Sequence, residues 1–262
     1  MKIVVAGSTG FVATEIIRQA LSHSDITTVV ALGRREISAP PNLGPTADPS
    51  KLKSVILQDF ENYTKDVKEE LTGLDAVIWT IAIVPSKLKT ISWEQACKIS
   101  RDYAIKGIET ISQLPREGKT KPLRFIYMSG SHAERNQSKK PLILGDYRLM
   151  RRSALLLRTP AKLSIASVQG DAESRILAYA QQFNGAVEAC VARSGVIEDP
   201  EETAILAKVG RMVIWILVNL PKVAVSVISA ALLDQVVKGF EKDTLLNEDL
   251  VRIGQKALAG QK

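Results

Sequence analysis

The sequence predicts an α/β fold with a doubly wound parallel sheet, helices on both faces and a short C-terminal helical cap. Short apolar runs alternate with segments of helical periodicity along the 262 residues, and a glycine-rich turn joins the first run to the first helix. Parallel strands need a crossover segment between them, and the intervening helices supply it. No internal repeat or linker-like composition interrupts the pattern, so we expect one domain over residues 1–262.

Six strands are predicted, because short apolar runs rich in β-branched residues are typical of buried parallel strands. These runs cover residues 3–6, 28–32, 54–57, 76–79, 125–128 and 187–192. Helices are predicted where apolar residues recur every three or four positions. The helical segments cover residues 11–21, 65–71, 93–114, 171–182, 204–218, 225–240 and 248–259. The last three of these segments form the predicted cap, residues 203–262, on the substrate side.

Composition narrows the class of protein. Hydrophobic residues make up 45% of the chain and charged residues 24%, as in ordinary globular proteins. The net charge of +7 comes from scattered lysines and arginines, which argues against a nucleic-acid partner. The longest apolar stretch, 212–218, is far shorter than the ~20 residues of a membrane span, so a buried helix or a pocket wall is expected there; contact with a membrane surface is the alternative.

The compartment is predicted from the cysteines and the amino terminus. Cys97 and Cys190 lie far apart without motif spacing, which indicates buried thiols in a reducing compartment. The apolar run at residues 3–6 is too short for a secretion signal. We therefore expect a cytoplasmic protein.

A glycine-rich turn carries the first functional signal. It follows the first predicted strand, opens the first helix and reads Gly7-Ser8-Thr9-Gly10-Phe11-Val12-Ala13. Gly7 permits a tight turn, Gly10 lets the backbone approach a phosphate, and the small Ala13 lets helix and strand pack closely. Unpaired N–H groups at the helix start attract anions. This context predicts dinucleotide binding, the alternative being a merely tight strand–helix turn.

The end of the second strand predicts which dinucleotide is bound. NAD-binding proteins usually place an acidic residue there, whereas this sequence reads Gly33-Arg34-Arg35. A guanidinium offers permanent charge and a fork of donors that suit a ribose phosphate. We therefore expect NADP, with NAD as the weaker ligand; the alternative is a pair of solvated arginines. Asp59, after the third strand, either accepts from the adenine amino group or caps the following turn.

Several motifs together resemble a known family. They are Gly7-x-x-Gly10-x-x-Ala13, Arg34-Arg35, Asp59-Phe60, the run from Phe125 to Gly130, and Tyr147-x-x-x-Arg151. In combination they resemble atypical short-chain dehydrogenases of the NmrA-like and Tat-interacting-protein-like group, particularly fungal members. The resemblance implies an NAD(P)-binding Rossmann fold, with cofactor contacts from Phe60, Thr80, Ile81, Ala82 and Gly195.

The resemblance also implies a set of catalytic residues. Tyr147 matches the family's general acid or base, and either Ser129 or Ser131 matches the serine that polarises a carbonyl. A phenol needs a neighbouring cation to act as a base at neutral pH. Arg151 stands where the family has lysine, and arginine does not give up its proton. The substitution favours slower hydride transfer or none.

A second departure from the family follows Arg151. Family members run from the tyrosine–lysine segment directly into a helix of the form Gly-x-x-Glu, matched here by Gly170 to Glu173. Residues 152–169 intervene, and Pro160 would break a continuing helix. We interpret 152–169 as an insertion, such as translated non-coding sequence, that loops out beside the site; a genuine apolar lid is the alternative.

These observations predict an NADP-dependent oxidoreductase acting on a small or medium apolar carbonyl or alcohol, and the resemblance suggests a place in secondary metabolism. The alternatives are an NADP-binding regulator of the NmrA-like type and a non-redox isomerase or lyase. No metal is expected, because His23 and His132 lack partners at ligand spacing. The sequence does not predict an oligomeric state.

Overall fold

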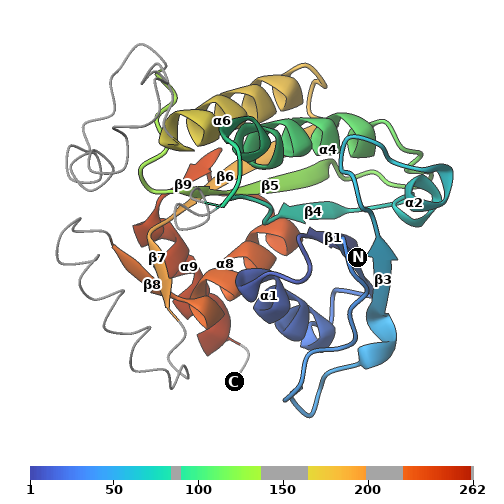
Figure 1. The fold of residues 1–262 in the computed structure, drawn as a ribbon. Helices are drawn as coiled ribbons and strands as arrows, with labels where there is room; N and C mark the ends of the chain where they lie inside the picture. Colours follow the sequence, from blue (N-terminus) through green and yellow to red (C-terminus); the bar gives the residue numbers. More distant parts are fainter. Residues whose placement is uncertain (84–89, 137–164, 199–220, 261–262) are drawn as a thin grey trace.

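A seven-stranded sheet forms the centre of the computed structural model, which describes residues 1–83, 90–136, 165–198 and 221–260 (Figure 1). The strand order is β3-β2-β1-β4-β5-β6-β9, and each neighbouring pair is parallel. The strands are β1 (Lys2–Ala6), β2 (Thr28–Gly33), β3 (Leu52–Ile56), β4 (Ala76–Trp79), β5 (Leu123–Gly130), β6 (Val187–Ser194) and β9 (Thr244–Leu245). The predicted doubly wound parallel sheet is confirmed.

Helices cover both faces of the sheet, as Figure 1 shows. One layer contains α1 (Phe11–Ser22), α8 (Val225–Lys238) and α9 (Asn247–Ala259). The other contains α2 (Lys65–Glu70), α4 (Tyr103–Ser112) and α6 (Ile165–Gln181). Strand β1 serves both layers, because Ile3 and Val5 pack into the first core while Val4 and Ala6 pack into the second. A strand covered on two faces must be apolar at every position, which explains the unbroken runs in the sequence.

The crossovers place a topological switch point between β1 and β4. Helix α1 follows β1 into one layer, whereas α3 (Trp93–Cys97) and α4 follow β4 into the other. The two connections leave the sheet in opposite directions beyond the carboxyl ends of these neighbouring strands. Doubly wound folds bind their ligands at such a switch point.

The structure differs from the sequence prediction in several elements. The helix expected over 93–114 is divided into α3, a π-helical turn at Lys98–Asp102 (η3) and α4. Strand β9 was not predicted, and neither was the small parallel sheet of β7 (Val196–Glu198) and β8 (Lys222–Ala224). A one-turn 3-10 helix, η1 (Pro49–Lys51), precedes β3. Strands of two or three residues are too short to produce a recognisable periodicity.

The C-terminal helices were expected to cap the substrate side. In the structure α8 packs between α1, α9 and the sheet, and most of its side chains are buried. Together, α8 and α9 complete one of the two layers that cover the sheet. The remaining part of the predicted cap, residues 203–220, lies outside the described residues.

Candidate functional site

The glycine turn after β1 is held by backbone hydrogen bonds. Gly7 has a φ of +89°, a conformation that residues with a Cβ rarely adopt. The N–H groups of Gly7 and Ser8 both donate to the carbonyl oxygen of Leu32, at 2.9 and 3.2 Å. The N–H of Gly10 donates to the carbonyl of Gly7 at 2.8 Å. These bonds fix the turn against the end of β2.

The amino end of α1 is open to a ligand. Gly10 is the N-cap residue, no side chain caps the helix, and the first turn carries no acidic residue. The first N–H groups of a helix have no intrahelical acceptors, and the helix dipole favours a negative charge there. A Cβ atom at Gly10 would lie 3.1 Å from the carbonyl oxygen of Gly7, so glycine keeps this approach clear. The geometry therefore suits a phosphate group.

The segment after β4 forms a wall beside the turn. A Cβ atom at Gly7 would lie 2.7 Å from Thr80 Oγ1 and 3.0 Å from Ile81 Cγ1, which excludes any side chain. The hydroxyl of Thr80 donates to the carbonyl of Ala6 at 2.7 Å, tying the wall to β1. The predicted cofactor residues Thr80 and Ile81 thus lie next to the glycine turn, and Ala82 is half-buried in the same segment.

Ser8 and Gly33 are packed together where the turn meets β2. Ser8 is only 1% exposed and its hydroxyl has no hydrogen-bond partner. A Cβ atom at Gly33 would lie 2.4 Å from Ser8 Oγ. The Ser8 side chain is therefore a packing element, and only its backbone can face a ligand. Sequence reasoning did not assign this role to Gly33.

Arg34 and Arg35 follow β2 with exposed side chains. Neither guanidinium makes an ion pair or hydrogen bond with the residues that the structure describes, whereas the carbonyl of Arg34 accepts a bond from Gln58 Nε2 at 2.8 Å. The backbone at this position is thus anchored while both charged groups are free. They lie on the β2 side of the glycine turn, where a 2′-phosphate on an adenosine ribose would be expected.

Asp59 and Phe60 have local roles that the structure makes clear. Asp59 accepts hydrogen bonds from the N–H of Glu61 at 3.2 Å and from Asn62 Nδ2 at 2.6 Å. The bond from Glu61 is the main cause that holds the pKa of Asp59 below its ordinary value. Of the two roles weighed for Asp59, turn capping is the one observed.

The Phe60 side chain cannot contact a cofactor as expected, because it is 2% exposed. Its ring packs against those of Trp79 and Tyr103, with centroids 5.7 and 5.5 Å apart. A phenyl group gains more by burial in this aromatic cluster than by lining a polar cradle. Phe60 is a core residue.

The two candidate serines at the end of β5 differ in access. Ser129 is 5% exposed, and its hydroxyl is buried without a partner. Ser131 is half-buried, its N–H donates to the carbonyl of Ser194 at 2.8 Å, and its hydroxyl lies 3.4 Å from His132 Nδ1. Ser131 is the serine that a substrate can reach without a rearrangement.

Tyr147, Arg151 and residues 152–164 lie outside the described residues. The last five residues of the predicted insertion, 165–169, form the first part of α6, which was expected to begin at Gly170 or Asp171. Val168 is 1% exposed, and Gln169 Oε1 would lie 3.3 Å from a Cβ atom at Gly130. This described end of the segment is packed beside the end of β5 and does not loop out, because its side chains are buried against the fold.

Gly195 has a packing role in the structure. A Cβ atom there would lie 1.8 Å from the carbonyl oxygen of Pro221. Its N–H donates to Asn247 Oδ1 at 2.9 Å. The N–H of Gly195 is therefore used within the fold, and its expected contact with the cofactor stays a prediction.

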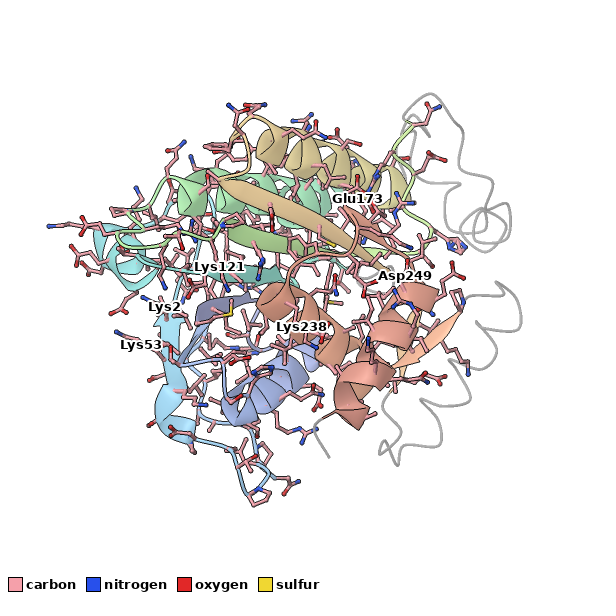
Figure 2. All side chains as sticks on the ribbon, turned by 180° about the vertical axis from the view of Figure 1, so that it is seen from behind. Lys2, Lys53, Lys121, Glu173, Lys238 and Asp249 are labelled. Atoms are coloured by element: carbon pink, nitrogen blue, oxygen red, sulfur yellow. The ribbon has the colours of Figure 1, made fainter. Side chains whose placement is uncertain are left out.

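A buried carboxylate joins the elements around the end of β6. Glu173 on α6 is fully buried and accepts bonds from Arg135 Nε at 2.7 Å and from Arg193, with the shortest contact 2.5 Å. Figure 2 places Glu173 at the opposite end of the sheet from Lys2, Lys53 and Lys121. Gly170, one turn earlier, packs against the backbone of Glu134. The Gly-x-x-Glu pattern signalled this helix, but the two arginine partners carried no local signal.

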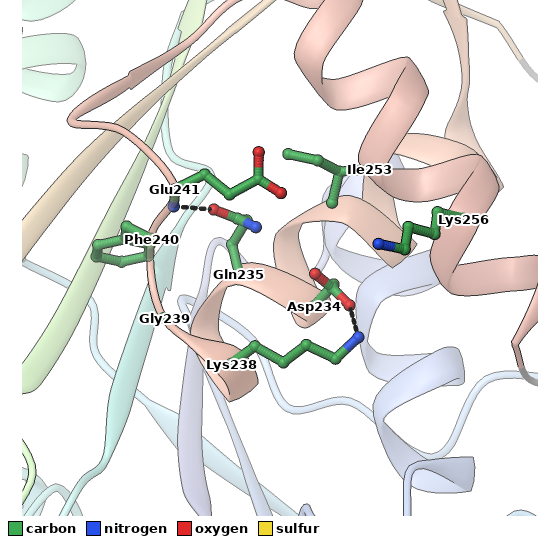
Figure 3. Close-up of a pocket in the computed structure, with 8 residues that line it drawn as sticks. All are labelled: Asp234, Gln235, Lys238, Gly239, Phe240, Glu241, Ile253 and Lys256. Atoms are coloured by element: carbon green, nitrogen blue, oxygen red, sulfur yellow. Dashed lines mark hydrogen bonds and ion pairs between the residues drawn. The ribbon is translucent and has the colours of Figure 1, made fainter.

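A separate cavity of about 340 Å³ lies between the end of α8 and α9 (Figure 3). Gly239, in its lining, lies near the side chain of Arg124 at the beginning of β5. The cavity therefore lies towards the amino ends of the strands, whereas the glycine turn lies beyond their carboxyl ends. Its charged residues are paired in part, as Lys238 with Asp234 and Glu241 with Arg252. It does not belong to the candidate site.

The described residues contain no group of three or more histidine, cysteine, aspartate or glutamate side chains that could hold a metal ion. Within the same ranges, every helix is too short or too polar to cross a bilayer.

Comparison with known proteins supports the fold. The sequence matches no family model and no curated protein. Among solved structures, MoeE5 in complex with UDP-glucuronic acid and NAD has a TM-score of 0.60 and 14% identity, covering 94% of this chain and 75% of that chain. The PhqB reductase domain from Penicillium fellutanum has a TM-score of 0.60 and 13% identity, covering 93% of this chain and 65% of that chain.

A third solved structure is similar over almost the whole chain. It is the DesIV double mutant (dTDP-glucose 4,6-dehydratase) from Streptomyces venezuelae with NAD and DAU bound, with a TM-score of 0.59 and 16% identity, covering 99% of this chain and 81% of that chain. At such identities the likeness establishes a Rossmann-like α/β fold. The resemblance to NmrA-like proteins continues to rest on the sequence motifs alone.

Proposed function

We propose that this chain binds NADP across the carboxyl ends of β2, β1 and β4 and acts as an oxidoreductase on a small or medium apolar carbonyl or alcohol. The observation that carries the proposal is the uncapped amino end of α1, reached through a turn in which Gly7 has no room for a side chain and Gly10 has little. The NAD-bound structures with similar folds support the same ligand class. A nicotinamide dinucleotide bound here supplies or accepts the hydride.

The chain's own residues would divide the remaining work. The N–H groups at the start of α1 hold the diphosphate, and the free guanidiniums of Arg34 and Arg35 hold the 2′-phosphate. At the end of β5, Ser131 can orient a substrate oxygen through its accessible hydroxyl. We propose Tyr147 as the proton donor or acceptor, assisted by the charge of Arg151.

The insertion hypothesis for 152–169 predicts which residues a shortened chain would place in α6. Joining Arg151 to Gly170 would place residues 147–151 at the helical positions that 165–169 now fill. Tyr147 would then take the position of Ile165, and Arg151 that of Gln169, beside Gly130 at the end of β5. Met150 would replace the buried Val168, an apolar exchange that a core tolerates.

Binding of the nucleotides tests the proposal directly. Titration calorimetry with NADPH and NADH at several salt concentrations should give tighter NADPH binding, with a preference that falls as salt rises. Loss of NADPH absorbance should then be measured with aldehydes, ketones and quinones. Equal affinities for the two nucleotides would remove the NADP assignment, and binding of neither would remove the proposal.

An NADP-binding regulator of the NmrA-like type is the second candidate. Arginine at position 151 and the intervening residues 152–169 favour it, because both disturb the tyrosine–lysine arrangement of the enzymes. Tight NADPH binding without turnover of any carbonyl compound would select this candidate. A non-redox isomerase or lyase is a third, and conversion of a substrate without net change in NADPH would identify it.

A further inference from the structure

The helix that follows β4 widens at a single buried residue. Residues Trp93 to Ser112 run as α3, the π-helical turn Lys98–Asp102 and α4. Ser100, in the wide turn, is fully buried. A π-helical turn disturbs the usual hydrogen-bond pattern of the helix and often occurs at functional sites. The carbonyl of Ser100 accepts a bond from the hydroxyl of Tyr127 at 2.9 Å.

The hydroxyl of Ser100 reaches the wall beside the glycine turn. Ser100 Oγ accepts a hydrogen bond from the N–H of Ile83 at 3.0 Å. Ile83 lies three residues after Thr80, whose N–H and hydroxyl both donate to the carbonyl of Ala6, at 3.0 and 2.7 Å. The segment from Thr80 to Ile83 is thus held at one end by β1 and at the other by the wide turn.

The position of this segment predicts which half of a dinucleotide it faces. Arg34 and Arg35 lie beyond β2, on one side of the glycine turn, and the Thr80–Ile83 segment lies beyond β4, on the other. A dinucleotide whose diphosphate lies at α1 and whose adenosine lies toward β2 must extend its second half toward β4 and β5. The wall from Thr80 to Ile83 would flank that second half.

We propose that Ser100 is a positioning residue for the nicotinamide half of the cofactor, acting through the Ile83 N–H. The inference rests on the proposed function. Tyr127 supports Ser100, because its hydroxyl bonds to the carbonyl that the wide turn presents inward. Without the Ser100 hydroxyl, the end of the wall loses its anchor and the Ile83 N–H loses its partner. Neither Ser100 nor Tyr127 needs to touch the cofactor.

The test compares a whole dinucleotide with its adenosine half. NADPH and adenosine 2′,5′-bisphosphate should be titrated into the wild type and Ser100→Ala. The variant should bind NADPH about tenfold more weakly, the cost of one good hydrogen bond. Its affinity for the bisphosphate, which ends before the wall, should stay within about twofold of the wild type. A uniform loss for both probes, or none for either, overturns the proposal.

Two variants keep the test sharp. Ser112→Ala removes a hydroxyl on the same helix that bonds to Tyr179 and the carbonyl of Glu109, and it should change neither affinity. Tyr127→Phe leaves the Ser100 hydroxyl in place but removes the hydrogen bond to the Ser100 carbonyl. It should weaken the binding of NADPH, but not of the bisphosphate, and by less than Ser100→Ala does. It serves as the test if Ser100→Ala does not fold. An unselective effect of Tyr127→Phe contradicts the proposal. A wild type that binds the bisphosphate but not NADPH also contradicts it, and one that binds neither probe overturns the proposed function itself.

Discussion

Single residues fix the geometry of the glycine turn in the candidate site. Gly7 combines a positive φ with a contact to Thr80 that leaves no room for a Cβ atom. Ser8 turns its hydroxyl into the fold against Gly33. Among the described residues, none bonds to the guanidiniums of Arg34 and Arg35, and Gln58 anchors the carbonyl of Arg34. The turn thus exposes backbone at the start of α1, with two guanidiniums on the side of β2.

The two arginines give the first prediction. The double substitution Arg34→Ser with Arg35→Ser should weaken NADPH binding by at least about tenfold, since charge-assisted bonds to a phosphate are lost. NADH lacks that phosphate, so its affinity should change by less than about threefold. Calorimetry at two salt concentrations measures both. The matched control is Arg175→Ser, an exposed arginine on α6, which should affect neither nucleotide; an equal loss of NADPH and NADH would contradict the assignment.

The contact between Ser8 and Gly33 gives the second prediction. Gly33→Ala should destabilise the fold by about 1–3 kcal/mol, because its Cβ atom would overlap Ser8 Oγ. Ser8→Gly removes the obstructing group and should restore part of the loss when combined with Gly33→Ala. Ser8→Ala alone should be neutral or stabilising, because the hydroxyl is buried without a partner. Urea denaturation measures the wild type, the three single variants and the double variant, and strictly additive effects of Gly33→Ala and Ser8→Gly would refute the contact.

At the scale of elements, charged side chains fix the beginnings and positions of helices. Asp249, in the first turn of α9, accepts a bond from the N–H of Leu246 at 3.0 Å and from Lys242 Nζ at 2.8 Å. Glu173 joins α6 to β6 and to the segment after β5 through Arg193 and Arg135. Figure 2 shows Asp249 and Glu173 on the same side of the molecule, away from Lys2 and Lys53. Asp249 thus fixes the beginning of α9, and Glu173 fixes the position of α6 against β6.

Acid should weaken α9 through Asp249. The hydrogen bond from Lys242 is the main cause that holds the pKa of Asp249 below its ordinary value. A carboxyl with a lowered folded-state pKa stabilises the protein above its unfolded pKa, about 4, and this contribution is lost as pH falls through the folded value. Asp249→Asn should therefore lower the free energy of unfolding at pH 7 by about 1 kcal/mol and reduce its loss between pH 7 and pH 3.

Glu248→Gln is the control for Asp249→Asn, because Glu248 is an exposed acid in the same turn of α9. Its removal should leave the acid limb of the stability curve nearly unchanged. Denaturant unfolding across this pH range measures all three proteins. Parallel curves for the wild type and Asp249→Asn would show that Lys242 and the Leu246 N–H do not favour the charged carboxyl.

Substitution of Glu173 should lower the free energy of unfolding more than substitution of Asp249. Glu173→Gln removes a fully buried negative charge that pairs with two partly exposed arginines. This loss should lower the free energy of unfolding by about 3 kcal/mol. Chemical denaturation measures the loss. The control, Glu188→Gln, breaks a half-exposed ion pair with Arg124 and should cost well under 1 kcal/mol. A Glu173 effect as small as that of Glu188 would mean that the arginines are satisfied without the charge.

For the whole molecule, the architecture places the candidate site at the carboxyl ends of the strands. The glycine turn, the free arginines and Ser131 all lie beyond the carboxyl ends of the strands, where a doubly wound sheet opens its crevice. The cavity between α8 and α9 lies towards the amino ends of the strands, beside charged pairs (Figure 3). The candidate site is therefore assembled from four neighbouring strands, and no single element contains it.

Deletion of residues 152–169 tests the organisation of the whole chain. The shortened protein should fold, bind NADPH at least as tightly as the full chain, and gain any turnover that the full chain lacks, because Tyr147 would join α6 beside the end of β5. Circular dichroism, calorimetry and NADPH oxidation measure these three properties. A deletion of the same length at 208–225 would cut into the buried start of α8 and should prevent folding. Loss of both folding and binding on deletion of 152–169 would refute the insertion hypothesis.

The sequence by itself determined the parallel α/β fold and the glycine-rich turn between β1 and α1. Local patterns in the sequence indicate both: apolar runs separated by helical segments predict the fold, and glycines between a strand and a helix predict the turn. The tertiary structure alone decided that Phe60 is a core residue, that Ser8 packs on Gly33, and that Ser100 anchors Ile83. These features join residues 17 to 25 positions apart or side chains from several elements, and a local pattern records which residues are apolar or small without recording which of them will meet.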